Sequence, residues 1–415
     1  MRRLCVTSIL ILCAALTLCE VAFAVPATWQ QLAELTPSNR AKNDWFGISI
    51  ASSGNTVVVG DFDANIETYG TVDVFVKPAS GWANMTQTAT LTSSDNGIGF
   101  GVSVAISGDI IVVGAANTSN FHDPADTAGA AYVFVKPAGG WKNMTETLKL
   151  TATDGMSGDA FGDSVSVSGN TIAVGAFFVN NFSGRVYVFT CSSGTCTQAA
   201  ELTASDSDGI LDYLGCSVAI SGNTVIAGSY GHNNFEGSAY VYVEPAGGWT
   251  NMTETAELST GGEGSDNMGF SVAISGGTAV AGAPGAFNYY GAAYVFVEPP
   301  TGWVTTSSYT AGLGAPDAAQ YDSFGQAVAI NENGKAIAVG APGQNIGANL
   351  EQGAVYAYGQ PKSGWKTTRH AYAEATASDG ASADLMGTSI AVSGATVVAG
   401  APKSSSPGAA YVFGR

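Results

Sequence analysis

The chain has 415 residues and a formal charge of −18, and only 12% of its residues are charged. A chain of this length can form roughly two or three average domains or one large repeat domain. The negative charge disfavours nucleic acid and anionic membrane surfaces as partners, because both attract clustered Lys and Arg. With 54 glycines and 46% hydrophobic residues, the composition is typical of stacked sheets joined by many turns.

Residues 1–24 are predicted to be a secretory signal peptide. Two arginines open the chain, an apolar run spans 4–18, and an Ala-Phe-Ala sequence ending at Ala24 offers a cleavage site. Removing this segment, which contains two arginines and one glutamate, changes the formal charge from −18 to −19. No second long apolar stretch follows, and no anchor is expected after the last strand. We therefore expect residues 25–415 to be secreted, without membrane insertion.

A strand-like segment from Trp29 to Leu35 opens this chain, and a repeat follows it. In its best-formed copy the repeat reads FGVSVAISGDIIVVGA over 100–115, GAAYVFV over 129–135, and a last run from Trp141 to Leu150. The Gly of the first element recurs at intervals of 53 to 62 residues, at Gly47, Gly101, Gly162, Gly215, Gly269, Gly325 and Gly387. Seven copies in phase, with no linker between them, predict a single domain over 25–415.

Each copy contains four strand-like runs that are separated by Gly-rich turns. A Ser-Gly-Asn-Thr sequence, as at 53–56, predicts a tight hairpin between the first two runs. The second run is apolar on both faces, as Val57-Val58-Val59 illustrates, so we expect it to be buried between sheets. Four-stranded antiparallel units that stack face to face predict an all-β fold, a seven-bladed β-propeller.

Two cysteines of the third copy, Cys191 and Cys196, flank a short turn between two strand-like runs. They can face each other across a hairpin, and a disulfide is favoured over two free thiols because export permits one. Cys216, in the next copy, is interpreted as a small side chain in a strand.

The two ends of the chain are complementary. The last copy stops after three strands, the third of which covers 408–413, whereas the segment from Trp29 to Leu35 matches the fourth strand that runs from Trp249 to Leu258. We therefore predict that the N-terminal strand completes the last blade and closes the ring, which hides the edges of an open stack.

The pattern FG-x-SVAIS, VVGAP and GAAYVF resembles the FG-GAP repeat of integrin α-subunit propellers and of their bacterial exported relatives. The Phe-Gly pair is retained at Phe46, Phe100, Phe161 and Phe324, and Gly-Ala-Pro at Gly282, Gly340 and Gly400. The resemblance implies the same propeller and an adhesion role. It also implies a ligand-binding end that is formed by the loops before Phe-Gly and after Gly-Ala.

The resemblance further implies calcium sites, which integrin-type repeats hold as Asp-x-Asp-x-Asp-Gly-x-x-Asp in the hairpin between the first two strands. The hairpins of this chain are too short and too poor in carboxylates for such sites. Acidic residues gather instead before Phe-Gly, most densely at Asp206, Asp208 and Asp212. Their recurrence across copies favours hydrogen bonding in turns over metal binding. We expect no cofactor, and calcium at this loop is the alternative.

The sequence contains no motif of a catalytic site, and its three histidines lie in different repeats without metal-ligand spacing. We expect a monomeric binding or adhesion module, not an enzyme, whose variable loops bind a protein or glycan. The candidate ligand-binding aromatics are Phe121, Tyr230, Phe235, Phe287, Tyr289 and Tyr290. The alternatives are that these rings fold back onto the blades, that the protein is purely structural, or that it is a polysaccharide lyase or hydrolase with carboxylates from separate loops.

Overall fold

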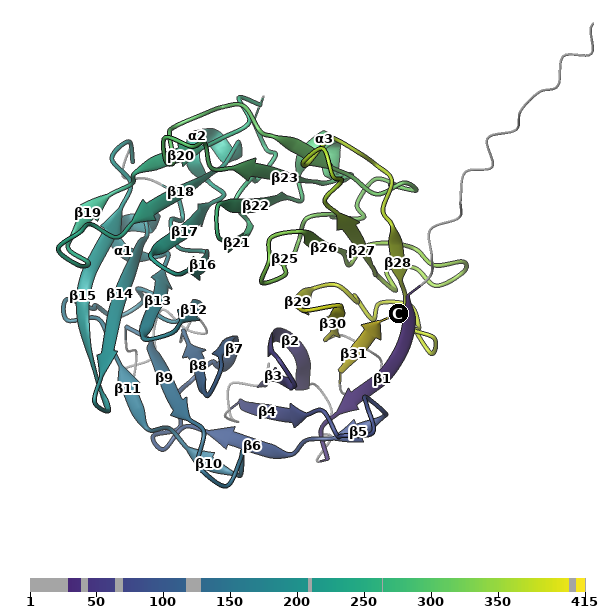
Figure 1. Cartoon of the computed structure of the whole chain (residues 1–415), viewed down its shortest axis with the longest axis horizontal. Helices are drawn as coiled ribbons and strands as arrows, with labels where there is room; N and C mark the ends of the chain where they lie inside the picture. Colours follow the sequence, from purple (N-terminus) through teal and green to yellow (C-terminus); the bar gives the residue numbers. More distant parts are fainter. Residues whose placement is uncertain are drawn as a thin grey trace, which may run out of the picture.

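The protein is an all-β ring of seven antiparallel sheets, called blades 1 to 7 here (Figure 1). This computed structural model describes residues 29–38, 44–63, 70–116, 128–207, 211–262, 264–402 and 408–414. The predicted signal peptide lies outside the described residues. In the part that is described, no helix has the length and apolar character needed to cross a membrane. The predicted seven-bladed β-propeller is confirmed.

The first four blades follow one another along the chain, and each is named here from its innermost to its outermost strand. Blade 1 consists of β2 (Asp44–Ser53), β3 (Thr56–Asp63), β4 (Thr71–Val76) and β6 (Ala89–Thr92). Blade 2 consists of β7 (Phe100–Ser107), β8 (Ile110–Ala115), β9 (Ala130–Val135) and β11 (Leu148–Leu150). Blade 3 consists of β12 (Ser164–Ser168), β13 (Thr171–Ala176), β14 (Arg185–Ser192) and β15 (Thr195–Thr203). Blade 4 consists of β16 (Ser217–Ser221), β17 (Thr224–Ser229), β18 (Ser238–Val243) and β20 (Ala256–Leu258).

The other three blades complete the ring. Blade 5 consists of β21 (Ser271–Ser275), β22 (Thr278–Ala283), β23 (Ala292–Val297) and β24 (Ala311–Leu313). Blade 6 consists of β25 (Val328–Ile330), β26 (Ala336–Ala341), β27 (Ala354–Gly359) and β28 (Ala373–Ala375). Blade 7 consists of β29 (Ser389–Ser393), β30 (Thr396–Ala401), β31 (Ala409–Gly414) and β1 (Gln30–Thr36).

Short segments link neighbouring blades along the outer rim. The two-residue strands β5 (Met85–Thr86), β10 (Met144–Thr145) and β19 (Met252–Thr253) each pair in parallel with the outermost strand of the preceding blade. Three helical turns, α1 (Val179–Phe182), α2 (His232–Phe235) and α3 (Ala286–Tyr289), connect the second and third strands of blades 3, 4 and 5.

The ring closes as predicted, with the N-terminal strand as the outermost strand of blade 7. Strand β1 pairs antiparallel with β31, with Leu35 opposite Ala410 (purple beside yellow in Figure 1). The predicted match of Trp29 to Trp249 is wrong by three residues. Gln31 Oε1 accepts a hydrogen bond from Ser378 N, as Glu254 does from Ser205 N, so Trp29 stands where blade 4 has a methionine.

The core lies between blades, where the second and third strands are apolar on both faces. Phe100 of blade 2 is fully buried and meets Tyr132 and Phe134 edge-on, at centroid distances of 5.4 and 6.1 Å. The backbones of adjacent blades approach closely at a glycine of the second strand. A Cβ atom added to Gly114 would lie 1.8 Å from the carbonyl oxygen of Gly162. This contact explains why the Gly of the Gly-Ala element recurs in the sequence.

The predicted disulfide is present. Cys191 and Cys196 face each other across the β14–β15 hairpin and are bonded. Both pack against the apolar cluster between blades 2 and 3. The equivalent cluster between blades 3 and 4 includes Trp249.

Candidate functional site

The loops that vary most between repeats gather at one end of the ring. In a four-stranded antiparallel blade, the connections from strand 2 to strand 3 and from strand 4 to the next blade lie at the same end. We call this end the loop face, and it contains α1, α2 and α3 (Figure 1). The hairpins between strands 1 and 2 lie at the opposite end.

Blades 3, 4 and 5 present a left-handed turn on the loop face. Each has three consecutive residues with positive φ and an aromatic residue at the third, with φ of 71° at Phe182, 67° at Phe235 and 67° at Tyr289. This conformation is rare for bulky side chains and persists only where the surroundings impose it. Here the aromatic residue's carbonyl oxygen accepts a hydrogen bond from the next loop, as from Tyr213 N to Phe182 O at 2.7 Å and from Tyr321 N to Tyr289 O at 2.9 Å.

Aromatic rings form a continuous surface from these turns. Tyr213 stacks on Tyr230 at 4.8 Å, and Tyr230 contacts Phe235 and Phe270 at 6.3 and 5.6 Å. Further round the ring, over blade 5, the side chains become strongly exposed. Phe287 is 62% exposed, more than expected of a ring that folds back onto its blade.

The structure places the described members of the predicted aromatic set on the loop face of blades 4 and 5; they are Tyr230, Phe235, Phe287, Tyr289 and Tyr290. Tyr230 is half-buried in its stack, whereas the other four are exposed. Phe121 lies outside the described residues. Sequence reasoning missed Tyr213 and Tyr321, which come from the loops before Phe-Gly and stack on members of the predicted set.

A cavity of about 440 Å³ opens on the loop face of blade 5. It is lined by aromatic rings, including Tyr289, Tyr294 and Tyr309, and by polar side chains that include Asp266 and Thr260. The hydroxyl oxygen of Thr260 is buried there, and it has no hydrogen-bond partner among the residues that the structure describes. Burial, and secondarily the charge of Glu236, raises the pKa of Asp266 above its usual range.

This cavity exists because blade 5 departs from the repeat. In blades 2, 3, 4 and 6 an aspartate of the preceding loop accepts a hydrogen bond from the tyrosine hydroxyl of the third strand. The aspartate's position in blade 5 is Gly262, and within the described residues no carboxylate binds the hydroxyl of Tyr294. A second cavity of about 150 Å³ shares Phe287, Tyr294 and Tyr309 with the first.

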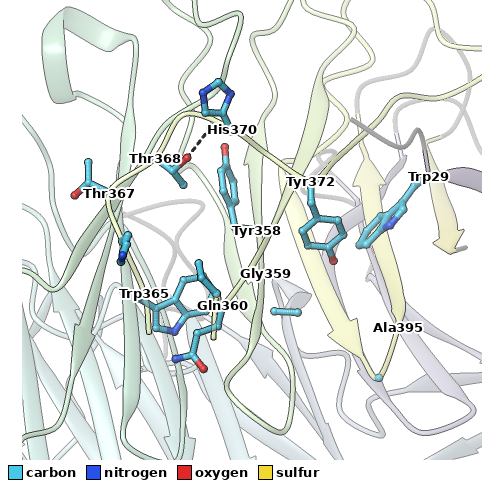
Figure 2. A pocket seen from close by; sticks show the side chains of 14 residues that line it. Trp29, Tyr358, Gly359, Gln360, Trp365, Thr367, Thr368, His370, Tyr372 and Ala395 are labelled. Carbon is cyan, nitrogen blue, oxygen red and sulfur yellow. Dashed lines mark hydrogen bonds between the residues drawn. The ribbon is translucent and has the colours of Figure 1, made fainter. Parts of the chain in front are cut away.

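A further cavity, of about 740 Å³, lies between blades 6 and 7 and belongs to the seam of the ring. Trp29, Trp365 and Tyr372 line it, with Ala395 of the β29–β30 hairpin (Figure 2). Trp29 and Tyr372 meet edge-on at 5.9 Å. In blade 7 the third and fourth strands, β31 and β1, come from opposite ends of the described sequence, so no hairpin joins them.

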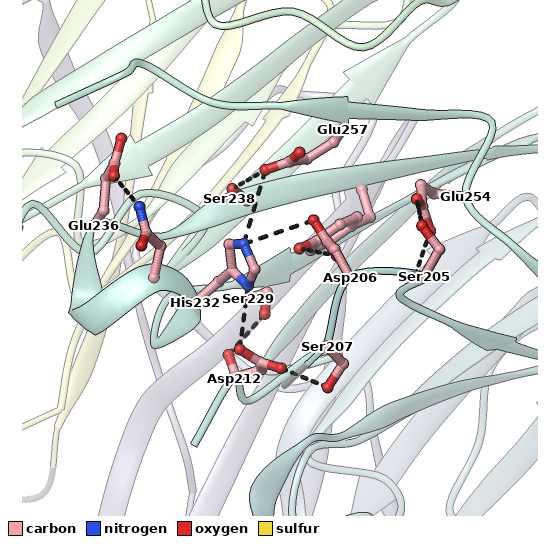
Figure 3. Close-up of polar contacts among 12 residues, drawn as sticks. Ser205, Asp206, Ser207, Asp212, Ser229, His232, Glu236, Ser238, Glu254 and Glu257 are labelled. Atoms are coloured by element: carbon pink, nitrogen blue, oxygen red, sulfur yellow. Dashed lines mark hydrogen bonds and ion pairs between the residues drawn. The ribbon is translucent and has the colours of Figure 1, made fainter. Parts of the chain in front are cut away.

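The predicted acidic loop contributes to a polar cluster around His232 of α2 (Figure 3). Asp212 Oδ1 lies 3.1 Å from His232 Nδ1, and Asp206 Oδ2 lies 3.7 Å from Nε2. The imidazole ring thus separates the two carboxylates, which do not face each other as in a calcium loop. Asp208 lies outside the described residues. Sequence reasoning missed His232 and Glu257 as neighbours of this loop.

The hairpins that would hold calcium in integrin-type repeats do not fit that ion here. Strands 1 and 2 are joined by two-residue turns, as between Ser53 and Thr56. The longer turn of blade 6 contains Glu332, but its carboxylate accepts hydrogen bonds from the Ser393 hydroxyl and Gly394 N of blade 7. Calcium requires several oxygen ligands on one loop, which these turns do not supply.

Fold and site together define a repeat propeller that presents aromatic and acidic loops at one end. A model of the FG-GAP repeat family matches seven segments, 29–75, 85–134, 144–189, 196–242, 253–296, 308–358 and 371–413. The chain belongs to the FG-GAP repeat family, as the resemblance implied. No curated protein matches the chain. Among solved structures it is similar to a chain of Kuenenia stuttgartiensis hydrazine synthase, with 15% identity, a TM-score of 0.53, and coverage of 92% of this chain and 99% of that one. At this identity the similarity concerns the fold alone.

Proposed function

We propose that this protein is a secreted, monomeric binding module that holds a glycan on the loop face of blade 5. The cavity beside Tyr294 carries the proposal. It combines exposed rings with the carboxylate of Asp266 and with the Thr260 hydroxyl, which binds no other described residue. Its volume of about 440 Å³ lies within the range of small-ligand sites, which are mostly apolar with a few placed polar groups. An adhesion role follows where the glycan belongs to a cell surface.

Rings and polar groups in this arrangement suit a sugar, which has both apolar C–H faces and hydroxyl groups. The rigid blade supports the site from below, since Tyr294 is 5% exposed and belongs to the core cluster between blades 4 and 5. Phe287 and Tyr289 sit on the α3 turn above it. Such variable residues on a fixed scaffold are typical of binding loops.

Glycan binding is tested by calorimetric titration of residues 25–415 with a panel of soluble polysaccharides. Two variants address the cavity, Thr260→Val, which removes the hydroxyl at constant volume, and Phe287→Asn, which keeps a residue that tolerates positive φ. Val304→Ala is the matched control, because Val304 is 47% exposed on the segment preceding β24 and does not line the cavity.

We expect saturable binding that weakens by about tenfold or more in both cavity variants and stays unchanged in the control, since leaving a polar partner unpaired costs about 1–3 kcal/mol. Binding that is insensitive to both variants refutes the placement of the site. Release of reducing ends or unsaturated products during the titration supports the enzymatic alternative. Binding of a protein ligand in place of every glycan contradicts the ligand class.

A further inference from the structure

A pair of carboxylates recurs at the outer edge of the loop face, and blade 3 shows how it is neutralised. Asp154 and Glu201 both contact Arg185, whose Nη1 lies 2.5 Å from Asp154 Oδ2 and 3.0 Å from Glu201 Oε2. Tyr187 donates its hydroxyl to the other oxygen of Asp154. The guanidinium therefore lies between the two carboxylates and offsets their charge.

Blade 4 has the same carboxylate pair without the arginine. Asp206 and Glu257 occupy the positions of Asp154 and Glu201, and Ser238 stands where Arg185 does, at the start of the third strand. The imidazole of His232 enters the vacant position from α2 (Figure 3). Its Nε2 lies 3.7 Å from Asp206 Oδ2 and 4.0 Å from Glu257 Oε1, and both separations exceed hydrogen-bond length.

Each of the three side chains is held by a further group. Asp212, only 3% exposed, contacts His232 Nδ1 at 3.1 Å, which fixes the ring and directs Nε2 toward the two carboxylates. The Tyr240 hydroxyl donates to Asp206 Oδ1 at 2.9 Å, and Ser238 Oγ donates to Glu257 Oε1 at 2.7 Å. A histidine whose second nitrogen binds a carboxylate, with ligand carboxylates that are themselves hydrogen-bonded, is typical of metal sites.

We propose that Asp206, His232 and Glu257 bind one divalent transition-metal ion, with zinc as the reference ion and Asp212 as a positioning residue. One ligand atom from each of the three lies within 4.8 Å of the others. Metal–ligand bonds of about 2.0–2.2 Å need only a small inward movement of these side chains. An imidazole nitrogen among the ligands favours zinc and its neighbours over calcium, which takes about six to eight oxygen ligands.

The site goes beyond the proposed glycan binding and does not depend on it, because it lies in blade 4. Three protein ligands leave a coordination position for water or another ligand. Asp206 is exposed, so this position can be reached from solvent. The metal would also fix α2, and with it Phe235, against the loop that enters blade 4.

The test uses residues 25–415 freed of metal with EDTA and titrated with ZnCl2 by calorimetry, and with CoCl2 by visible absorption. His232→Gln removes the ligand, and His370→Gln, in blade 6, is its matched control. Asp212→Asn leaves all three ligands and changes only the partner of Nδ1. Ser238→Arg places a guanidinium between Asp206 and Glu257, as Arg185 does between the equivalent carboxylates of blade 3. This variant therefore blocks the metal position with an arrangement that the fold already contains.

We expect one zinc ion per chain in the wild type and in His370→Gln, with no stoichiometric binding in His232→Gln or Ser238→Arg. Asp212→Asn should weaken binding by about 10- to 100-fold, as partners of ligating histidines do. The cobalt complex should show a d–d band that is absent from Ser238→Arg. Should the wild type bind no stoichiometric zinc, or should Ser238→Arg and His232→Gln bind it as tightly as the wild type, the proposal is overturned. Ser238→Arg copies the arrangement of Arg185 in blade 3, so it still tests zinc binding if His232→Gln fails to fold.

Discussion

Closure of the ring by β1 can be tested at one side chain, Leu35. It is fully buried between blades 7 and 1, in a cluster with Phe46 and Val412. Leu35→Ala removes three carbon atoms from this packed site, and such changes cost about 2–5 kcal/mol, depending on how far the surroundings collapse. We expect Leu35→Ala to lower the free energy of unfolding by about 3 kcal/mol, because rigid strands on both sides of the site restrict its collapse.

The assay is equilibrium unfolding in urea, followed by far-ultraviolet circular dichroism. The change in the free energy of unfolding is calculated from the shift in the urea midpoint, provided that the dependence of this free energy on urea concentration is unchanged. Leu202→Ala provides the internal reference, because Leu202 is fully buried at the same position of blade 3. Leu32→Ala on β1 is the exposed control, since Leu32 is 37% exposed, and we expect it to cost less than about 1 kcal/mol. If Leu35→Ala costs no more than Leu32→Ala, β1 is not an integral strand and the ring closure is refuted.

Three further predictions concern other parts of the fold. Gly114→Ala places a Cβ 1.8 Å from a backbone oxygen of blade 3 and should lower the free energy of unfolding by more than about 3 kcal/mol in the same assay. Gly139→Ala is the control, because no atom lies within 4 Å of its Cβ, and it should lower that free energy by less than about 1 kcal/mol. Burial raises the pKa of Asp163 to about 7, so the folded protein loses stability as the pH rises from about 4 through 7 and this carboxyl ionises. Asp163→Asn should therefore stabilise the protein more at pH 8 than at pH 5. An equal effect at the two pH values would contradict this. Replacing Cys191 and Cys196 by Ser should cost about 2 kcal/mol, the value for a short closed loop, and an unchanged urea midpoint would show that the disulfide does not contribute.

The sequence predicted the ring because its glycines are fixed by backbone contact. A Cβ atom at Gly60 or Gly114 would clash with a carbonyl oxygen of the next blade, so only glycine fits there. One such glycine occurs in each repeat, and the number of repeats therefore gives the number of blades. The disulfide was predictable for a similar reason, since a hairpin brings Cys191 opposite Cys196. Features of this kind depend on one local geometry that repeats.

The polar cluster could not be found from motif spacing. Asp206, His232 and Glu257 come from three different connections and strands, and they meet only when blade 4 forms its sheet beside the loop from blade 3. Comparison of equivalent repeat positions would have indicated it, since Ser238 replaces Arg185 while both carboxylates remain. The left-handed turns had no such signal, because their φ angles depend on hydrogen bonds from the following loop.

Each matched segment begins with the outermost strand of one blade and continues with the inner strands of the next, as 29–75 does with β1 and then β2 to β4. Blade 7 therefore contains both the first and the last of the described strands, and β1 cannot form its antiparallel pair until residues 409–414 have been synthesised. Until then the edge of β1 that faces β31 has no partner, and unpaired strand edges tend to associate with other chains. On β1, Gln30 and Leu32 are exposed, whereas Ala33 and Leu35 are buried. Because β1 and β31 are far apart in the sequence, we expect their pairing to be a late step in folding. A chain that lacks β31 would present two open strand edges, one on β1 and one on β30, and we expect these edges to favour association with other chains.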